Sequence, residues 1–143
     1  MKKQCVVVPV DFSDNTEAAV RAALAFVDSP SQVNVVHVLF ALDAVSPGVV
    51  FGGVSDESRT ENINEHFDKL KLALDTPELG TEVRIGNPGV QITDYANELG
   101  ADLIVIPSHG YHGFKRMILG SVAERVIRLA ACDVYVLRRN DAE

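Results

Sequence analysis

The sequence predicts an α/β protein built on a doubly wound, five-stranded parallel sheet of the Rossmann-like type. Five strand patterns alternate with four helix patterns along the 143 residues, an order that favours parallel strands joined by helices. The strand patterns at residues 5–10 and 103–106 are apolar throughout, as expected for strands buried on both faces, whereas residues 81–85 alternate like an edge strand. These observations predict the strand order 3-2-1-4-5 within one domain, residues 1–143.

The first two strands enclose an alanine-rich helix. After the strand at residues 5–10, Asp14 and Glu17 stand three positions apart, which is typical of a capping box at a helix start. The helix is predicted to run to about Val27, and its small side chains would let it lie close to the sheet. The second strand is predicted at residues 33–39.

A long connection and a second helix follow. Residues 40–55 show no helical period and carry Pro-Gly and Gly-Gly turn signals, so they predict a loop. Ser58 and Glu61 predict the next capping box. One apolar helical stripe continues from there, through Ile63, Phe67, Leu70 and Leu74.

The third strand, at residues 81–85, leads into a helix with clear start and stop signals. Asn87 is predicted to be its N-cap and Pro88 its first residue. Gly100 is predicted to close it.

The buried strand at residues 103–106 precedes the last helix. Ser121 and Glu124 predict a capping box at the start of this helix. The last strand is predicted at residues 134–137, and in the order 3-2-1-4-5 it would be an exposed edge that invites association.

Composition and charge narrow the function. Hydrophobic residues make up 47% of the chain and charged residues 23%, as in an ordinary soluble globular protein. The net charge of −7 disfavours binding to nucleic acid or to an anionic membrane, and no stretch approaches the roughly 20 apolar residues of a membrane span. The N-terminus leaves no room for a signal peptide, and two cysteines are too few for a disulfide framework or zinc site. We therefore expect a cytoplasmic protein.

The predicted strand order places a topological switch between the first and fourth strands. In doubly wound folds, ligands bind at the carboxyl ends of the strands that flank this switch, here residues 9–11 and 107–110. Nine residues separate Gly110 from Gly120, and Gly120 with Ser121 opens a helix. Backbone N–H groups and the positive end of a helix dipole can therefore bind a phosphate. The sequence predicts a nucleotide-binding crevice at this edge of the sheet.

Each candidate residue also has a plain structural role. Asp11 could accept a hydrogen bond from a ribose hydroxyl or adenine amine, or it could end the strand and orient the next helix. Gly120 could give a tight helix entry, and Ser121 could be an ordinary N-cap worth ~1 kcal/mol. Charge supports the ligand role, because residues 103–123 hold no Asp or Glu but include two basic residues.

The residues favour a non-enzymatic role and leave enzymatic activity open. A hydrolytic triad of Asp11, His109 and Ser108 or Ser121 would lack the nucleophile elbow Gly-x-Ser-x-Gly. No Gly-x4-Gly-Lys-Ser/Thr loop occurs, and no paired carboxylates are positioned for two metals. The four histidines show no metal-ligand spacing. The sequence therefore predicts no catalytic residue and no dedicated metal site.

An ordered set of motifs resembles one known family. The motifs are residues 6–13 (VVVPVDFS), 86–88 (GNP), 101–106 (ADLIVI), 108–110 (SHG) and 120–122 (GSV). Together they resemble the universal stress protein family over essentially the whole chain. The ATP-binding branch of that family carries Gly-x2-Gly-x9-Gly-Ser/Thr, and Gly110, Gly120 and Ser121 fall on its last three positions.

The resemblance implies ATP, or another adenine nucleotide, as the ligand. The residues implied to flank adenine and ribose or to line the base pocket are Pro9, Val10, Asp11, Val38 and Ile106. Those implied to surround ribose and phosphates are His109, Gly110, Gly120, Ser121 and Val122. Mg²⁺ or Mn²⁺ would be held mainly by the phosphates. The resemblance also implies a homodimer through the last strand, with a higher oligomer and an unidentified client protein as further candidates.

Three departures from the family pattern bear on function. Pro107 replaces the first signature glycine and lacks an N–H donor. Ala123 replaces a frequent second hydroxyl, and Asp133 replaces the proline that commonly opens the last strand. Since a branch of the family lacks the signature and does not bind ATP, three interpretations stay open. They are an ATP-binding stress or regulatory protein acting by nucleotide-dependent conformation or association, a nucleotide-independent dimeric interaction module, and a slow ATPase or autophosphorylating protein.

Overall fold

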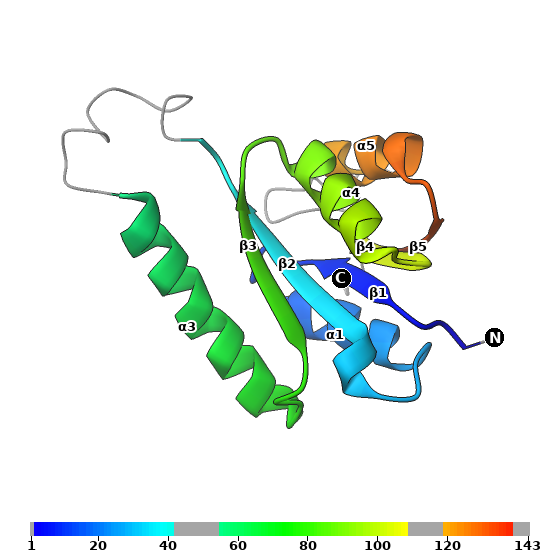
Figure 1. Cartoon of the computed structure of the whole chain (residues 1–143), viewed down its shortest axis with the longest axis horizontal. Helices are drawn as coiled ribbons and strands as arrows, with labels where there is room; N and C mark the ends of the chain where they lie inside the picture. The colour runs from blue at the N-terminus through cyan, green and yellow to red at the C-terminus, as the bar shows by residue number, and fades with distance from the viewer. Residues whose placement is uncertain (1, 42–54, 109–118, 139–143) are drawn as a thin grey trace, which may run out of the picture.

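The computed structural model describes residues 2–41, 55–108 and 119–138, which form a parallel sheet with helices on both faces (Figure 1). Its strand order is β3-β2-β1-β4-β5, and every neighbouring pair is parallel. The predicted fold class and strand order are confirmed. No helix in this described part of the chain is long and apolar enough to cross a membrane.

The elements alternate as the sequence predicts. In chain order they are β1 (Val6–Pro9), α1 (Thr16–Leu24), a 3-10 turn (Pro30–Gln32), β2 (Val33–Leu39), α3 (Asp56–Leu74), β3 (Gly80–Ile85), α4 (Pro88–Leu99), β4 (Leu103–Pro107), α5 (Ser121–Leu129) and β5 (Asp133–Leu137). The 3-10 turn was not predicted. Most of the predicted loop at 40–55 lies outside the described residues.

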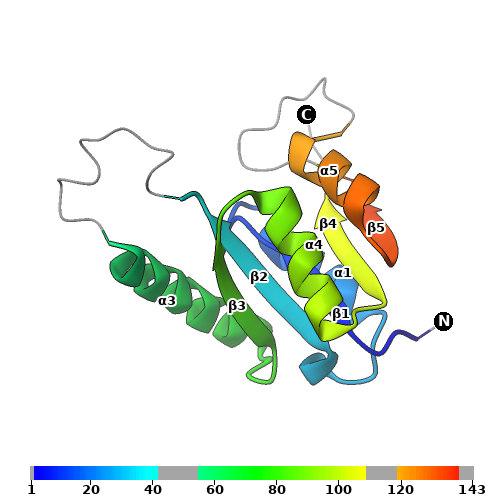
Figure 2. The ribbon, with the colours of Figure 1, turned by 45° about the horizontal axis from the view of Figure 1, so that its top comes forward.

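The central strands bury side chains on both faces, and this alternation builds two cores. Val6 and Val8 contribute to the core under α1 and α3, where Phe67 is also buried. Val7 points to the opposite face and shares a core with Val126 of α5. Figure 2 shows α4 and α5 next to each other on this second face, while α3 flanks β3 at the far end of the sheet from β5. A continuous apolar strand is the sequence pattern that such double burial requires.

The starts of α1 and α3 differ from the prediction. Asn15, not Asp14, is the N-cap of α1, because Ser13 already organises the preceding turn: its carbonyl accepts the N–H of Thr16 at 3.1 Å. α3 starts three residues earlier than predicted. Its N-cap is Ser55, which forms a reciprocal capping box with Ser58. The start of α4 at Asn87 and Pro88 and its end at Gly100 are confirmed.

Asp102 joins the start of β4 to the start of β1. Its two carboxylate oxygens accept the N–H groups of Gln4 at 3.0 Å and Cys5 at 3.1 Å. Desolvation opposes ionisation, but these hydrogen bonds outweigh it and lower the pKa of Asp102 below its ordinary value. The carboxylate therefore fixes the N-terminal edge of the two central strands.

Replacing Asp102 with alanine should lower the free energy of unfolding by about 1–3 kcal/mol, because two backbone donors lose a charged acceptor. Since the folded pKa is depressed, this contribution is full above the unfolded value of about 3.9 and is lost as pH falls through the folded value. Urea unfolding of wild type and variant measures the difference. The difference should be smaller at about pH 3 than at about pH 7; an equal difference at both would contradict the ionised acceptor.

Candidate functional site

The carboxyl end of β1 passes into a tight turn. The N–H of Val10 still donates to the carbonyl of Val36 in β2, at 2.9 Å, so the pairing of these strands extends one residue beyond Pro9. Asp11 follows, and its Oδ1 accepts the N–H of Ser13 at 3.0 Å. The structural role that the sequence allows for Asp11 is therefore present, and its role toward a ligand stays a prediction.

The carboxyl end of β4 holds the start of α5 in place. The N–H of Ser108 donates to the carbonyl of Leu137 in β5 at 2.8 Å, and the carbonyl of Ser108 accepts the N–H of Gly120 at 2.6 Å. Ser108 is buried. Gly120 is thus anchored to the end of β4, whereas His109 and Gly110 lie outside the described residues.

Pro107 fits this strand end without breaking the β4–β5 ladder. In a strand, successive backbone N–H groups point to opposite sides. Because the N–H of Ser108 faces β5, the nitrogen of Pro107 faces the β1 side. Its register with Leu137 is kept. The N–H that proline lacks would therefore have faced the crevice between β1 and β4. The candidate site has one backbone donor fewer as a result.

The start of α5 differs from the predicted capping box. Gly120 is the N-cap and Ser121 is the first helical residue, and no side chain of the described residues caps the helix. Glu124 instead pairs with Arg128 one turn later. Gly120 has φ −73° and ψ 158°, a conformation open to any residue, so it is not needed for its φ. The prediction of Ser121 as N-cap is wrong. Within residues 2–41, 55–108 and 119–138, the first-turn N–H groups have no side-chain cap.

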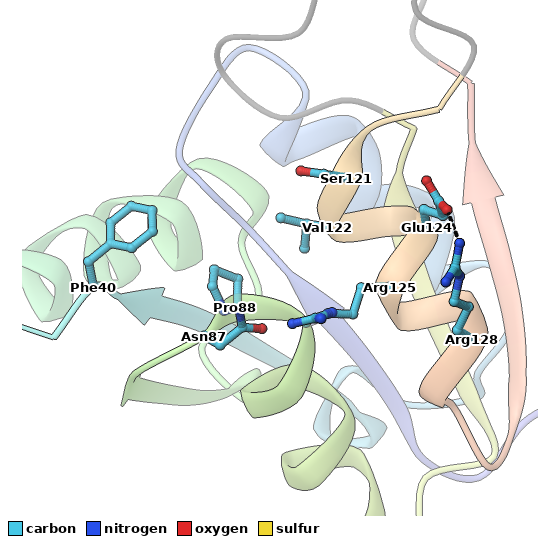
Figure 3. A pocket seen from close by; sticks show the side chains of 9 residues that line it. Phe40, Asn87, Pro88, Ser121, Val122, Glu124, Arg125 and Arg128 are labelled. Atoms are coloured by element: carbon cyan, nitrogen blue, oxygen red, sulfur yellow. Dashed lines mark hydrogen bonds and ion pairs between the residues drawn. The ribbon is translucent and has the colours of Figure 1, made fainter. Parts of the chain in front are cut away.

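A cavity of about 490 Å³ opens between the first turns of α4 and α5 and the end of β2 (Figure 3). Ser121, Val122 and Arg125 line it from α5, opposite Asn87 and Phe40. Of the predicted site residues that the structure describes, Ser121 and Val122 alone line this cavity. It is large enough for a small ligand.

Val38 and Ile106 lie under the same pair of helices. Ile106 is buried, and Val38 packs against the cluster that includes it, on the face covered by α4 and α5. The two residues assigned to the base pocket therefore share one apolar cluster. Pro9, Val10 and Asp11 lie at the adjacent end of β1, so the described site residues gather around the predicted switch.

Arg125 is a site residue that the sequence prediction missed. A Cβ on Gly89 would lie 2.5 Å from Cγ of Arg125, so this glycine lets the arginine stem lie against the first turn of α4. Figure 3 shows the guanidinium extending toward Asn87. Helical spacing from Ser121 (i, i+4) would have placed Arg125 on the same face. The arginine adds positive charge next to two helix N-termini, an arrangement that favours an anion.

The described residues do not form a metal site of their own. Within residues 2–41, 55–108 and 119–138, no group of three or more His, Cys, Asp or Glu side chains is placed to hold a metal ion.

These features define a doubly wound α/β domain with its candidate site at the switch between β1 and β4. The profile of the Universal stress protein family matches residues 4–138. The chain belongs to the universal stress protein family.

Known relatives and solved structures agree with this assignment. Universal stress protein MJ0531 of Methanocaldococcus jannaschii is 34% identical, with 96% of this chain and 84% of that protein aligned. The solved structure of hypothetical protein MJ0577 superposes with a TM-score of 0.82 at 26% identity, covering 99% of this chain and 100% of that one. A universal stress protein from Archaeoglobus fulgidus in complex with dAMP gives a TM-score of 0.58 at 26% identity, covering 95% and 98%.

Proposed function

We propose that this protein binds an adenine nucleotide at the carboxyl ends of β1 and β4 and acts in the stress response through nucleotide-dependent conformation or association. The observation that carries the proposal is the start of α5. Gly120 is fixed to the end of β4, and its missing side chain leaves the amides of the first turn available to an anion. The dAMP complex of the Archaeoglobus relative supports the same ligand class.

We assign separate residues to the base and ribose and to the phosphates of the nucleotide. Asp11, following Pro9 and Val10, would accept from the ribose or adenine, and Val38 and Ile106 would contact the base. The phosphates would lie at Gly120, Ser121 and Val122, with His109 and Gly110 completing the loop. ATP is the proposed nucleotide, and Mg²⁺ or Mn²⁺ would be bound mainly through its phosphates.

Pro107 should weaken this binding without preventing it. Losing one neutral hydrogen-bond donor costs about 1 kcal/mol, or roughly a fivefold change in affinity. The α5 start and the Arg125 side chain are unaffected by that loss. We therefore propose the ATP-binding branch of the family in spite of the substitution.

Mass spectrometry of the denatured protein will detect a copurified nucleotide. Calorimetric titration of nucleotide-free protein with ATP, ADP, AMP and cyclic AMP will then identify the preferred ligand. Heat from at least one adenine nucleotide is expected. No heat from any of them would favour the nucleotide-independent interaction module, and steady ADP release from ATP would favour the slow ATPase.

Ser121→Ala should weaken nucleotide binding by about three- to tenfold, because one hydroxyl donor to phosphate is lost. Its free energy of unfolding should stay within about 0.5 kcal/mol of wild type, since Ser121 is exposed and does not cap α5. Calorimetry and urea unfolding measure the two quantities. A loss of stability as large as the loss of binding energy would show that Ser121 acts as a cap after all.

We also propose that the protein is a cytoplasmic homodimer paired through β5, and that nucleotide binding changes its association with a client protein. The carrying observation is that β5 is an edge strand.

A further inference from the structure

Where the pairing of β1 with β2 ends, a side chain takes the place of a backbone N–H as hydrogen-bond donor. After the bond from Val10 N–H to Val36, a continued parallel ladder would bring the next β2 amide to the carbonyl of Val10. That acceptor is instead 2.7 Å from Nδ1 of the His37 ring. Because a carbonyl oxygen only accepts, Nδ1 carries the proton and donates.

His37 also contacts the residue on the other side of Asp11. Phe12 has φ 61°, in the left-handed region that a bulky side chain rarely adopts. Its ring centroid lies 5.2 Å from that of His37 and 5.0 Å from that of His66. The histidine thus holds Val10 by a hydrogen bond and Phe12 by ring packing, and Asp11 lies between these two residues.

The geometry points to His37 as a positioning residue of the nucleotide site. By fixing the carbonyl of Val10 through the hydrogen bond, it would orient the carboxylate of Asp11, whose Oδ1 accepts the N–H of Ser13, toward the ribose or adenine. This inference rests on the proposed nucleotide binding and assigns the histidine no contact with the ligand.

The link is a neutral hydrogen bond. Desolvation lowers the pKa of His37 below its ordinary value, so the ring is neutral near neutral pH. The charged or titratable groups that affect it are Asp11 from the β1 end and His66 from α3, with opposite signs. Its register partner in β3, Val83, carries no charge. A neutral amide donor can therefore replace the imidazole.

Two substitutions separate the hydrogen bond from ring packing. In His37→Asn the amide nitrogen is attached to Cγ, as Nδ1 is, so the donor is kept and the ring is lost. In His37→Phe the ring is kept and the donor is lost. Titration with ATP should give an affinity about tenfold weaker for His37→Phe and within about twofold of wild type for His37→Asn. His66→Asn is the matched control, because His66 touches the Phe12 ring without bonding to Val10, and its affinity should stay at the wild-type value.

The two variants should rank in the opposite order by free energy of unfolding than by affinity for ATP. Urea unfolding should show that His37→Asn is less stable than His37→Phe, because it removes a half-buried ring. If His37 were only structural, the less stable variant would also bind ATP more weakly. Weaker ATP binding by His37→Asn than by His37→Phe would therefore overturn the inference.

Amide hydrogen exchange of Ser13 provides a readout that needs no nucleotide. Exchange should be faster in His37→Phe than in wild type and His37→Asn. Without the bond to Val10, the turn that holds Asp11, the acceptor of this N–H, is loosened. If wild type binds no adenine nucleotide, the proposed function is wrong whatever the exchange rates. If wild type binds ATP but Ser13 exchanges equally in all three proteins, the positioning role of His37 is wrong and the proposed function stands.

Discussion

Replacing Gly120 with aspartate should weaken nucleotide binding by at least about a hundredfold and at the same time raise the free energy of unfolding by about 0.5 kcal/mol. Gly120 is the N-cap of α5 and its backbone conformation suits any residue. An aspartate there would accept the first-turn amides and complement the helix dipole. Its negative charge would occupy the position proposed for a phosphate and repel it.

Gly120→Asn is the matched control for charge. Asparagine caps a helix nearly as well as aspartate but is neutral, so its affinity should lie between those of wild type and Gly120→Asp. Calorimetric titration with ATP measures affinity, and urea unfolding measures stability. Binding by Gly120→Asp as tight as by wild type would show that no anion docks at the start of α5, and the proposed phosphate position would be wrong.

The strand order was predictable because the burial of a strand determines the pattern of apolar residues in its sequence. β1 and β4 pack side chains on both faces, and their sequences are accordingly apolar without interruption. β3 lies at an edge and its sequence alternates. The start and end of α4 were equally predictable, because Asn-Pro and Gly each have one favoured position at a helix terminus.

The other helix starts could not be predicted from local signals. Before α1 and α3 several capping residues stand in a row, so the sequence offers more than one start and the surrounding turn selects among them. At α5 the selection is tertiary: the hydrogen bond from Gly120 N–H to the Ser108 carbonyl fixes the N-cap one residue before Ser121. No local pattern encodes a contact between residues that far apart.

In the candidate site, too, some residues could be predicted from the sequence and others only from the structure. The residues at the ends of β1 and β4 follow from topology, because the carboxyl ends of adjacent parallel strands meet at one edge. The spacing of Arg125 from Ser121 indicates a shared helix face. Its position against Gly89 depends on the packing of α5 against α4, which the sequence of neither helix reveals. For His37 the sequence alone names no partner, and the structure shows its ring bonded to the carbonyl of Val10. The identity of the partner could come only from the structure.

Replacing Val136 with proline should convert the proposed dimer to monomer. The carbonyl of Leu137 accepts the N–H of Ser108, so Leu137 directs its backbone groups to β4. Because these groups alternate along a strand, Val136 directs its N–H to the open edge of the sheet. Proline removes that donor and leaves the β4–β5 ladder intact.

The exposed apolar side chains around β5 favour pairing at this edge. Tyr135 is 43% exposed, and on the neighbouring α5 Ile127 and Leu129 are 44% and 48% exposed. An edge strand beside apolar side chains is a favourable template for another copy of itself. Light scattering over a range of concentrations should give the dimer mass for wild type and for Val136→Thr, which keeps both the N–H and a β-branched side chain. It should give the monomer mass for Val136→Pro, provided circular dichroism shows a folded protein. A folded Val136→Pro with unchanged mass would mean that any self-association uses a surface other than β5, because proline removes one of the N–H donors that backbone pairing across this edge would use.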